Sequence, residues 1–161
     1  MDAPAIRRLG PQDIAPMRSL NALFARVFDD AASYASNLPE ASHLARILAR
    51  DHVIALVASV GDTVVGGLVA YRLDKLEQAR SEVYLYDLAV EAEHRRRGIA
   101  TALIEHLVAI AAAQGAWVVY VQADHGDDPA VALYEKLGAR EDVMHFDIPV
   151  RRAPAGQETA R

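Results

Sequence analysis

The amino-acid sequence predicts a mixed α/β fold, in which a mostly antiparallel sheet contains one parallel strand pair at its middle. Two strand-like segments, Val53–Val60 and Thr63–Tyr71, are separated by Gly61-Asp62, a two-residue connection typical of a β-hairpin. Further along, a strand-like run, a helical pattern and a second strand-like run follow one another between residues 83 and 121. A strand, a helix and a strand in this order indicate a parallel pair.

The first third of the chain is expected to contain one short strand and two helices. Ile6–Leu9 predicts a strand, and Gly10-Pro11 predicts the start of a helix that ends near Phe28. The polar segment from Asp29 to Pro39 is expected to form a loop, and such a loop can cover a site. Apolar residues between positions 44 and 48 then predict a short second helix.

The remaining elements follow from runs of β-forming residues and from helical spacing. Val83–Val90 predicts a long central strand, and Ile99–Gln114 predicts a helix. Ala116–Val121 is nearly continuously apolar, which is typical of a strand covered on both faces. Asp128-Pro129 predicts a helix start with a capping carboxylate, and Val143–Ile148 predicts a closing strand.

Length and composition indicate one soluble globular domain. Of the 161 residues, 52% are apolar and 24% are charged. Residues 1–150 are expected to form the domain, and the polar tail 151–161 is expected to be flexible. No apolar run approaches the roughly 18 residues that cross a bilayer, and the first residues lack the order of a signal peptide. A cytoplasmic protein is therefore expected.

Charge and cysteine content exclude several classes of site. The absence of cysteine excludes disulfides, thiolate metal sites and a cysteine nucleophile. The histidines do not have a metal-ligand spacing, so no metal is expected. The formal net charge of −5 argues against a nucleic-acid surface and suits a cationic ligand.

One segment combines a strand, a basic turn and the start of a helix. Leu88-Ala89-Val90 leads through Arg95-Arg96-Arg97-Gly98 into a predicted helix that begins Ile99-Ala100-Thr101. The first turn of a helix presents unpaired N–H groups and the positive end of the helix dipole, which suit a phosphate. Gly98 has no side chain to keep a ligand from the backbone. The alternative is a solvated basic turn that only caps the helix.

Two motifs in this sequence resemble the signatures of a known family. Arg95-x-x-Gly98-x-Ala100 after the hydrophobic strand resembles the acetyl-CoA signature of the GNAT acetyltransferase superfamily. Ala130–Gly138 resembles the second signature, a helix with a tyrosine, here Tyr134, near its end. From about Leu9 to Ile148 the chain is similar to the aminoglycoside 3-N-acetyltransferases of the gentamicin-modifying type. The similar segments are Glu77–Glu82, Tyr86–Val90, Val121–Asp124, Gly126–Tyr134 and Val143–Ile148.

The resemblance implies a GNAT-like sheet in which two central parallel strands splay, with helices on both faces and the pantetheine arm of acetyl-CoA between the strands. It also implies a homodimer. The residues expected to bind acetyl-CoA are Leu88, Ala89, Val90, Arg95, Arg96, Arg97, Gly98, Ile99, Ala100 and Thr101.

Transfer of an acetyl group to an amine requires a group that removes a proton, because alkyl amines are mostly protonated near neutrality. Asp87 is the candidate base, since an aspartate within a run of strand-forming residues is unusual and the matching aspartate in the resembled enzymes lies near the acceptor amine. Tyr134 is the candidate acid that protonates the CoA thiolate, as the resemblance implies. A backbone N–H of Ala89 or Val90 could stabilise the oxyanion. The alternative is that both side chains are structural, with Asp87 hydrogen-bonded to a neighbouring backbone group or tyrosine and Tyr134 packed in the core with its hydroxyl paired.

Acidic residues near the expected site suggest a cationic acceptor. Asp87, Asp124, Asp127 and Glu82 are the candidate acceptor-binding residues, because aminoglycosides are polycations rich in hydroxyl groups. A solvated acidic surface is the alternative for the loop acids. Asp127 stands where many GNAT proteins have an asparagine, which puts a side-chain amide contact to pantetheine in doubt.

These observations predict an acetyl-CoA-dependent N-acetyltransferase that acetylates the 3-amino group of gentamicin-like aminoglycosides and thereby confers resistance. The main alternative is a GNAT acetyltransferase for another small polyamine or metabolite. A CoA-binding module without catalysis is a second alternative, disfavoured because both Asp87 and Tyr134 are present. A nucleic-acid binder would need a wider basic face than three arginines.

Overall fold

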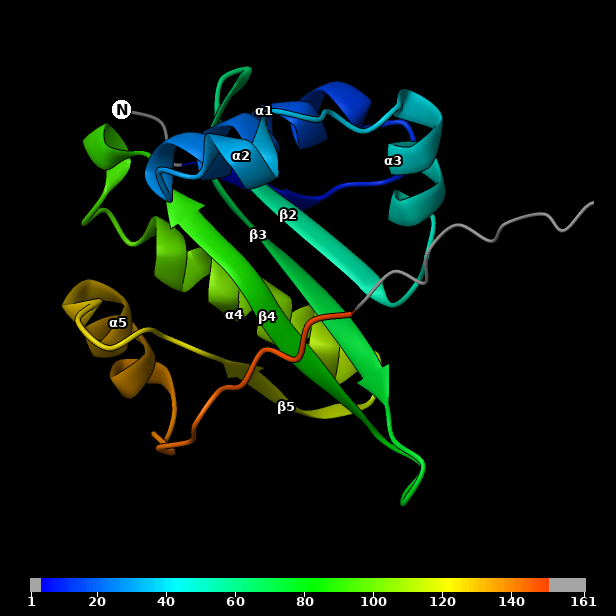
Figure 1. Cartoon of the computed structure of the whole chain (residues 1–161), viewed down its shortest axis with the longest axis vertical. Helices are drawn as coiled ribbons and strands as arrows, with labels where there is room; N and C mark the ends of the chain where they lie inside the picture. Colours follow the sequence, from blue (N-terminus) through cyan, green and yellow to red (C-terminus); the bar gives the residue numbers. More distant parts are fainter. Residues whose placement is uncertain (1–3, 151–161) are drawn as a thin grey trace, which may run out of the picture. The chain divides into compact units, whose positions relative to one another are not determined.

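The computed structural model describes residues 4–150 (Figure 1). It divides into two compact units, Met1–Asp124 and His125–Arg161, which are described separately. The tail expected to be flexible, residues 151–161, lies outside the described residues.

The first unit is built on a five-stranded mixed sheet. Its strands lie in the order of the chain: β1 (Ala5–Arg8), β2 (Val53–Val60), β3 (Thr63–Asp74), β4 (Ser81–Val90) and β5 (Ala116–Val121). Neighbouring strands from β1 to β4 are antiparallel, whereas β4 and β5 are parallel. The predicted mixed sheet, its hairpin at Gly61-Asp62 and its parallel pair are therefore confirmed. Among the described residues, however, the pair lies at one edge of the sheet and not at its middle.

Helices cover both faces of this sheet. The helices are α1 (Ile14–Val27), α2 (Ala31–Tyr34), α3 (Ala41–Leu48) and α4 (Ile99–Ala113), and Ala92–His94 form a short 3₁₀ turn, η1. Figure 1 shows α1, α2 and α3 on one side of the strands and α4 on the other. Two adjacent glycines of β3 mark the two faces, because a Cβ on Gly67 would meet Leu20 of α1 whereas one on Gly66 would meet Ile99 of α4.

The helix α1 begins later than the sequence predicts. Gly10-Pro11 form a turn in which the Gly10 N–H donates to Oδ2 of Asp13 at 2.7 Å. The Asp13 N–H donates back to the Gly10 carbonyl at 3.0 Å, and the first α-helical bond runs from the Met17 N–H to the Asp13 carbonyl. The prediction that the helix starts at Pro11 is wrong, because the Asp13 carboxylate holds these residues in a separate turn.

The core beneath α1 consists of large apolar side chains against small strand residues. Leu20, Leu23 and Phe24 are fully buried and belong to one cluster with Ala55, Val57 and Ala89. A Cβ on Gly67 would lie 2.6 Å from Cδ1 of Leu20 and 2.5 Å from the Leu56 carbonyl oxygen. Glycine at this position therefore lets α1 approach the sheet closely.

β5 is an edge strand of the sheet and is less buried than predicted. Trp117 is 57% exposed and Tyr120 is 36% exposed, so the expectation of a strand covered on both faces is wrong. Both side chains combine an apolar ring with a polar tip, and such residues make a partly exposed strand resemble a buried one in sequence.

The second unit contains the helix α5 (Asp128–Leu137). Its capping carboxylate belongs to Asp127, whose Oδ1 accepts from the Ala130 N–H at 3.2 Å, and Asp128 is the first helical residue. Val143–Ile148 is not a strand, so that prediction is wrong. Alternation suggests a strand, but a strand requires a partner for its backbone groups, and the described residues supply none for this segment.

Candidate functional site

The parallel strands β4 and β5 separate before β4 ends. Their last paired residues are Leu85 and Val121, and residues 86–90 of β4 continue with a neighbour on the β3 side only. The Glu91 N–H donates to the carbonyl of Val65 in β3, so N–H groups of β4 point alternately toward β3 and away from it. Those of Leu88 and Val90 therefore point toward the open edge. The expected splayed strand pair is therefore present in the first unit.

A β-bulge at Tyr86 determines which face Asp87 occupies. Leu85 pairs with Ala70 and Asp87 pairs with Val69, so Tyr86 is an extra residue without a partner on β3. Side chains of a regular strand alternate between the two faces, so residues 84 and 87 would lie on opposite faces. The extra residue shifts this alternation by one position, and Asp87 therefore lies on the same face as Tyr84. Val69 packs against the cluster beneath α1, so Asp87 lies on the face covered by α1, α2 and α3.

The Asp87 carboxylate is half-buried and has a phenol as its hydrogen-bond donor. The Tyr34 hydroxyl donates to Oδ1 of Asp87 at 2.8 Å. Burial raises the pKa of the Asp87 carboxyl above its ordinary value, and the hydrogen bond from Tyr34 offsets part of that rise because it stabilises the charged form. A carboxylate with a raised pKa is suited to accept a proton from an amine.

Four tyrosines form a connected row beside Asp87 on this face. Tyr84 stacks on Tyr120 of β5 with ring centroids 4.9 Å apart, and its ring meets Tyr86 edge-on at 5.4 Å. Tyr86 in turn contacts Tyr71 of β3 edge-on at 5.9 Å, and it is 59% exposed. The row therefore presents aromatic rings next to a carboxylate.

Glu82 lies on the same face but already has partners. Its carboxylate is 3.3 Å from Nζ of Lys75 and accepts from Nε1 of Trp117 at 3.3 Å. The Arg80 guanidinium lies over the Trp117 ring at 4.3 Å, a cation–π contact. Asp124 follows β5 and is exposed.

The basic turn before α4 has the backbone that a phosphate site requires. Gly98 is the N-cap of α4 with φ of 78°, and no side chain caps the helix. The N–H groups of Ile99, Ala100 and Thr101 therefore have no partner within the helix. A Cβ on Gly98 would meet no atom within 4 Å, so the approach to this backbone is open. Nε of Arg95 donates to the Val90 carbonyl at 3.0 Å and ties the turn to the end of β4.

Asp127 and Tyr134 belong to the second unit. Asp127 caps α5, so its carboxylate has a structural role there. Burial raises the pKa of the Tyr134 phenol above its ordinary value, and the negative charge of Asp127 adds to the rise. A tyrosine is already protonated near neutrality, and this shift keeps the Tyr134 phenol protonated further into the alkaline range.

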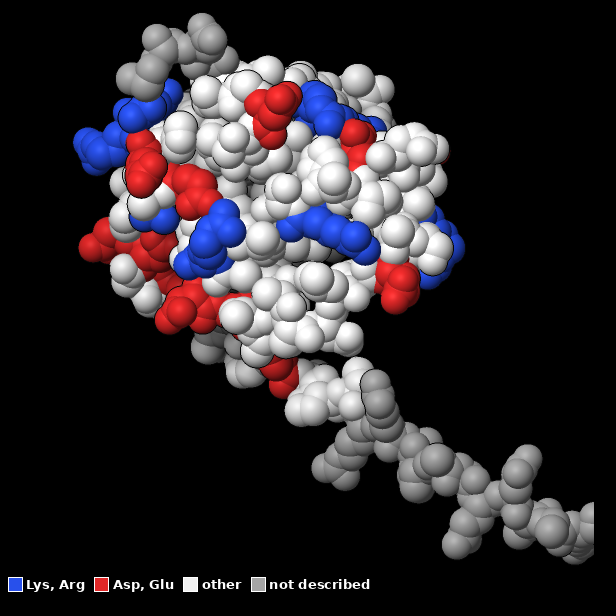
Figure 2. All heavy atoms as spheres, turned by 90° about the horizontal axis from the view of Figure 1, so that it is seen from above, with Lys and Arg blue, Asp and Glu red and all other residues white. Residues whose placement is uncertain are grey.

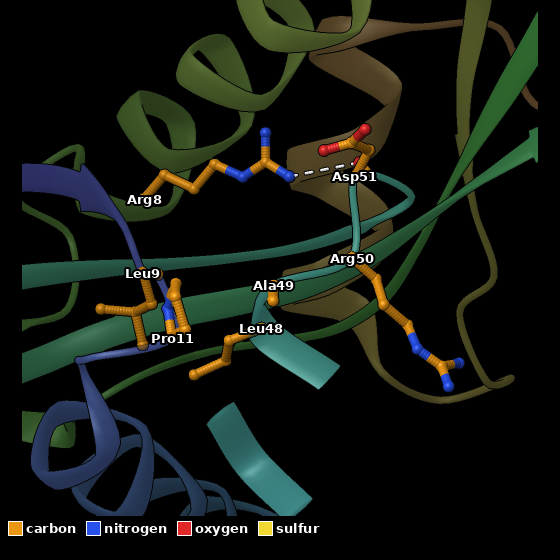
Figure 3. Close-up of a pocket in the computed structure, with 8 residues that line it drawn as sticks. Arg8, Leu9, Pro11, Leu48, Ala49, Arg50 and Asp51 are labelled. Carbon is orange, nitrogen blue, oxygen red and sulfur yellow. Dashed lines mark hydrogen bonds between the residues drawn. The ribbon is translucent and has the colours of Figure 1, made fainter. Parts of the chain in front are cut away.

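Figure 3 shows a hollow of about 400 Å³, whose lining residues do not include Asp87. It is open and is lined by residues of the β1–α1 and α3–β2 connections, among them Arg8, Leu48 and Asp51. Arg8 donates to the carbonyls of Asp51 and Val53, so its charge serves the local backbone. β2 and β4 run in the same direction, so the start of β2 lies at the end of the sheet opposite to Val90. The hollow beside the start of β2 is therefore remote from the open end of β4.

A second cavity, about 170 Å³, lies under α1 and α3 and closer to Asp87. It is mainly apolar, and its lining includes Val69, which pairs with Asp87, and Tyr71. Asn21 adds one polar side chain.

Residues 4–150 show neither a continuous basic surface in the view of Figure 2 nor a metal-binding cluster. In the view from above, Figure 2 shows acidic and basic side chains interspersed rather than one continuous basic field. No group of three or more histidine or acidic side chains in this range is arranged to hold a metal ion. None of its helices is long and apolar enough to cross a membrane.

Tyr34 and the tyrosine row are the main features that the sequence did not predict. Tyr34 lies in the segment expected to be a loop, where α2 is a single turn capped by Asp30, whose side chain accepts from the Ser33 N–H at 3.0 Å. Asp30 is a residue type favoured at the N-cap of a helix, and this signal could have revealed the turn. The bulge also leaves a signal in the sequence. The apolar positions of β4 are odd-numbered before it, at Val83 and Leu85, and even-numbered after it, at Leu88 and Val90.

Comparisons with known proteins agree with this geometry. Residues 18–139 match the profile of the acetyltransferase (GNAT) family. The crystal structure of aminoglycoside acetyltransferase HMB0005, from an uncultured soil metagenomic sample, is 51% identical with a TM-score of 0.91 and covers 93% of this chain and 100% of that one. Aminoglycoside acetyltransferase meta-AAC0020, also from an uncultured soil metagenomic sample and solved in complex with sisomicin, is 31% identical with a TM-score of 0.85. That comparison covers 92% of this chain and 97% of the other.

Curated relatives match a shorter region. N-acetyltransferase 8B of Rattus norvegicus is 32% identical over 90 residues, which are 56% of this chain. The [ribosomal protein bS18]-alanine N-acetyltransferase of Escherichia coli (strain K12) is 33% identical over 60 residues, which are 37% of this chain. The match spans 40% of the length of each of these two relatives.

Proposed function

Because this chain belongs to the acetyltransferase (GNAT) family, whose members use acetyl-CoA, we propose that it transfers the acetyl group to the 3-amino group of gentamicin-like aminoglycosides. The observation that carries the proposal is Asp87, a half-buried carboxylate with a raised pKa beside the open edge of β4. The similarity to two aminoglycoside acetyltransferases, one of them solved with sisomicin, supports this class of acceptor.

The turn at Gly98 fits acetyl-CoA. The uncapped start of α4 and the open approach at Gly98 suit its phosphates, and Arg95, Arg96 and Arg97 add positive charge. The outward N–H group of Leu88 suits an amide carbonyl of the pantetheine arm. When bound, acetyl-CoA supplies an acetyl group activated as a thioester.

In the proposed reaction, Asp87 accepts a proton from the acceptor amine. The free amine then forms the N–C bond to the acetyl carbon, and the C–S bond breaks with its electron pair on sulfur. Tyr134 donates its phenolic proton to that thiolate and recovers a proton from the acetylated nitrogen, which must lose its second proton to become an amide. This role is based on the family resemblance. The Val90 N–H is a better oxyanion donor than the Ala89 N–H, because alternation turns the Ala89 N–H toward β3.

The face that contains Asp87 suits a polycation rich in hydroxyl groups. The aromatic rings of Tyr86 and Tyr120 can pack against sugar rings or ammonium groups, and the Arg80–Trp117 contact already uses an aromatic ring of β5 in this way. Glu82 and Asp124 would add negative charge at the start of β4 and after β5. Asp127, as the α5 cap, is the weakest of the proposed acceptor contacts.

The test is release of CoA with gentamicin, kanamycin and spermidine as parallel acceptors. We expect gentamicin to give the highest kcat/KM. Turnover of spermidine without turnover of either aminoglycoside would overturn the proposed acceptor class in favour of another small polyamine. Binding of acetyl-CoA with no turnover of any acceptor would favour a module without catalysis.

A further inference from the structure

We propose that Tyr34 is a positioning residue for this reaction, in which its hydroxyl fixes Oδ1 of Asp87 and leaves Oδ2 as the oxygen that accepts the amine proton. This inference rests on the proposed function of Asp87, and it assigns a role to a helix that the reaction does not otherwise use. The contact that carries it is the 2.8 Å hydrogen bond from the Tyr34 hydroxyl to Oδ1.

The ring of Tyr34 is held by two aromatic contacts. It lies 5.6 Å from the ring of Phe24 of α1 and 5.7 Å from that of Phe28, the C-cap residue of α1. Phe24 is fully buried and stacks on Phe28 at 5.4 Å. The phenol therefore extends from an ordered aromatic cluster to the carboxylate.

The backbone of α2 also supports this placement. The Asp30 side chain caps the turn through the Ser33 N–H, and the Tyr34 N–H donates to the Asp30 carbonyl at 3.3 Å. The Ala35 N–H and the Ser36 N–H both donate to the Ala31 carbonyl. Tyr34 is the last residue of this short, capped turn, and its side chain can therefore orient the Asp87 carboxylate, 53 positions away in the sequence.

The surroundings of Asp87 keep the Tyr34 hydroxyl protonated, so that it remains a hydrogen-bond donor. Burial raises the pKa of the Tyr34 phenol well above its ordinary value, and the charge of Asp87 adds to the rise. The other titratable groups that act on this pair are Asp30 of the α2 cap, Tyr71 of β3, and Tyr84 and Tyr86 of β4. None of these adds a positive charge, so the Tyr34 hydroxyl is the group that stabilises the ionised form of Asp87.

A fixed Oδ1 has two consequences for the base. The hydrogen bond makes Oδ1 a weaker proton acceptor than Oδ2, because one of its lone pairs is already used by a donor that does not ionise in the working range. It also moderates the pKa of Asp87, which burial alone would raise further. Asp87 therefore remains ionised, and able to act as a base, at a lower pH than it would without Tyr34.

The test is Tyr34→Phe, which removes one oxygen and keeps the ring. We expect the acidic limb of the kcat/KM profile with gentamicin to move to higher pH by about one unit, since a hydrogen bond to a charged group is worth about 1.5–3 kcal/mol and one pKa unit corresponds to 1.36 kcal/mol. We expect kcat to fall about tenfold at neutral pH and acetyl-CoA affinity to stay unchanged.

The matched control is Tyr71→Phe, which removes a phenol oxygen on the same face of the sheet but leaves the Tyr34 hydroxyl and its aromatic cluster in place. It should leave the acidic limb where it is. An acidic limb that does not move in Tyr34→Phe, or that moves equally in Tyr71→Phe, would overturn the proposal.

A second measurement separates this inference from the proposed acceptor. An NMR titration of ¹³C-labelled Asp87 in the protein without acceptor should give a higher carboxyl pKa in Tyr34→Phe than in the unchanged chain. In the unchanged chain the Tyr34 Cζ signal should follow the same titration. An unchanged Asp87 pKa would contradict the role of Tyr34 even if gentamicin is a substrate, and a raised pKa would support it even if gentamicin is not.

Discussion

At the scale of single residues, the environment of Asp87 opposes stability and favours catalysis. Burial raises its folded-state pKa above the value in the unfolded chain. An acid of this kind stabilises the fold at low pH, and that contribution is lost as the pH rises through the raised pKa and the carboxyl ionises. Near neutrality the ionised Asp87 is therefore a cost to folding, as is common for groups retained for function.

Asp87→Asn tests this opposition directly. The amide keeps an oxygen for the Tyr34 hydroxyl but cannot accept the amine proton, so kcat should fall by roughly 10² to 10⁴. Acetyl-CoA affinity, measured by calorimetry, should stay nearly unchanged. The melting temperature at neutral pH should be equal to or higher than that of the unchanged chain.

Turnover that survives Asp87→Asn would remove Asp87 from the role of base. A large fall in the melting temperature at neutral pH would instead show that the ionised carboxylate is structural.

At the scale of elements, periodicity predicted most of the sheet and its helices. The hairpin, the parallel pair and the helix that begins at Ile99 follow from apolar spacing and from turn residues, because burial of one face acts on every residue of such an element. The single turn of α2 is too short to show a period, and the bulge at Tyr86 depends on one extra residue. The sequence therefore predicted Asp87 but not the donor that holds it.

The turn before α4 is the element with the sharpest test. Gly98→Val should weaken acetyl-CoA binding at least tenfold, because a branched side chain would stand on the open approach to the first turn of α4. The measurement is the Kd for acetyl-CoA by calorimetry.

Gly115→Val is the matched control for backbone strain. Gly115 has φ of 76°, close to the 78° of Gly98, and a Cβ there also meets no atom within 4 Å, but it lies beyond the other end of α4. Both variants should lose similar stability, and only Gly98→Val should lose affinity. Equal affinities in the two variants would contradict the phosphate assignment.

At the scale of the whole molecule, the net charge of −5 should attract a polycationic acceptor. We expect kcat/KM for gentamicin to fall several-fold as the ionic strength rises from about 0.01 M to about 0.3 M, because salt screens the attraction. Initial rates at low gentamicin concentration measure this dependence directly. An acceptor with a single amine, assayed in parallel, should show a weaker dependence.

The family and the sheet follow from sequence patterns that extend over most of the chain, whereas the acceptor depends on a few side chains around one carboxylate. The most direct measurement is therefore the structure of the product, determined by NMR after incubation with acetyl-CoA and gentamicin. The account predicts one acetyl group, on the 3-amino nitrogen, with one CoA released for each product formed. Acetylation at a different amine would contradict the assigned position, and unmodified gentamicin from a preparation that acetylates spermidine would contradict the proposed function.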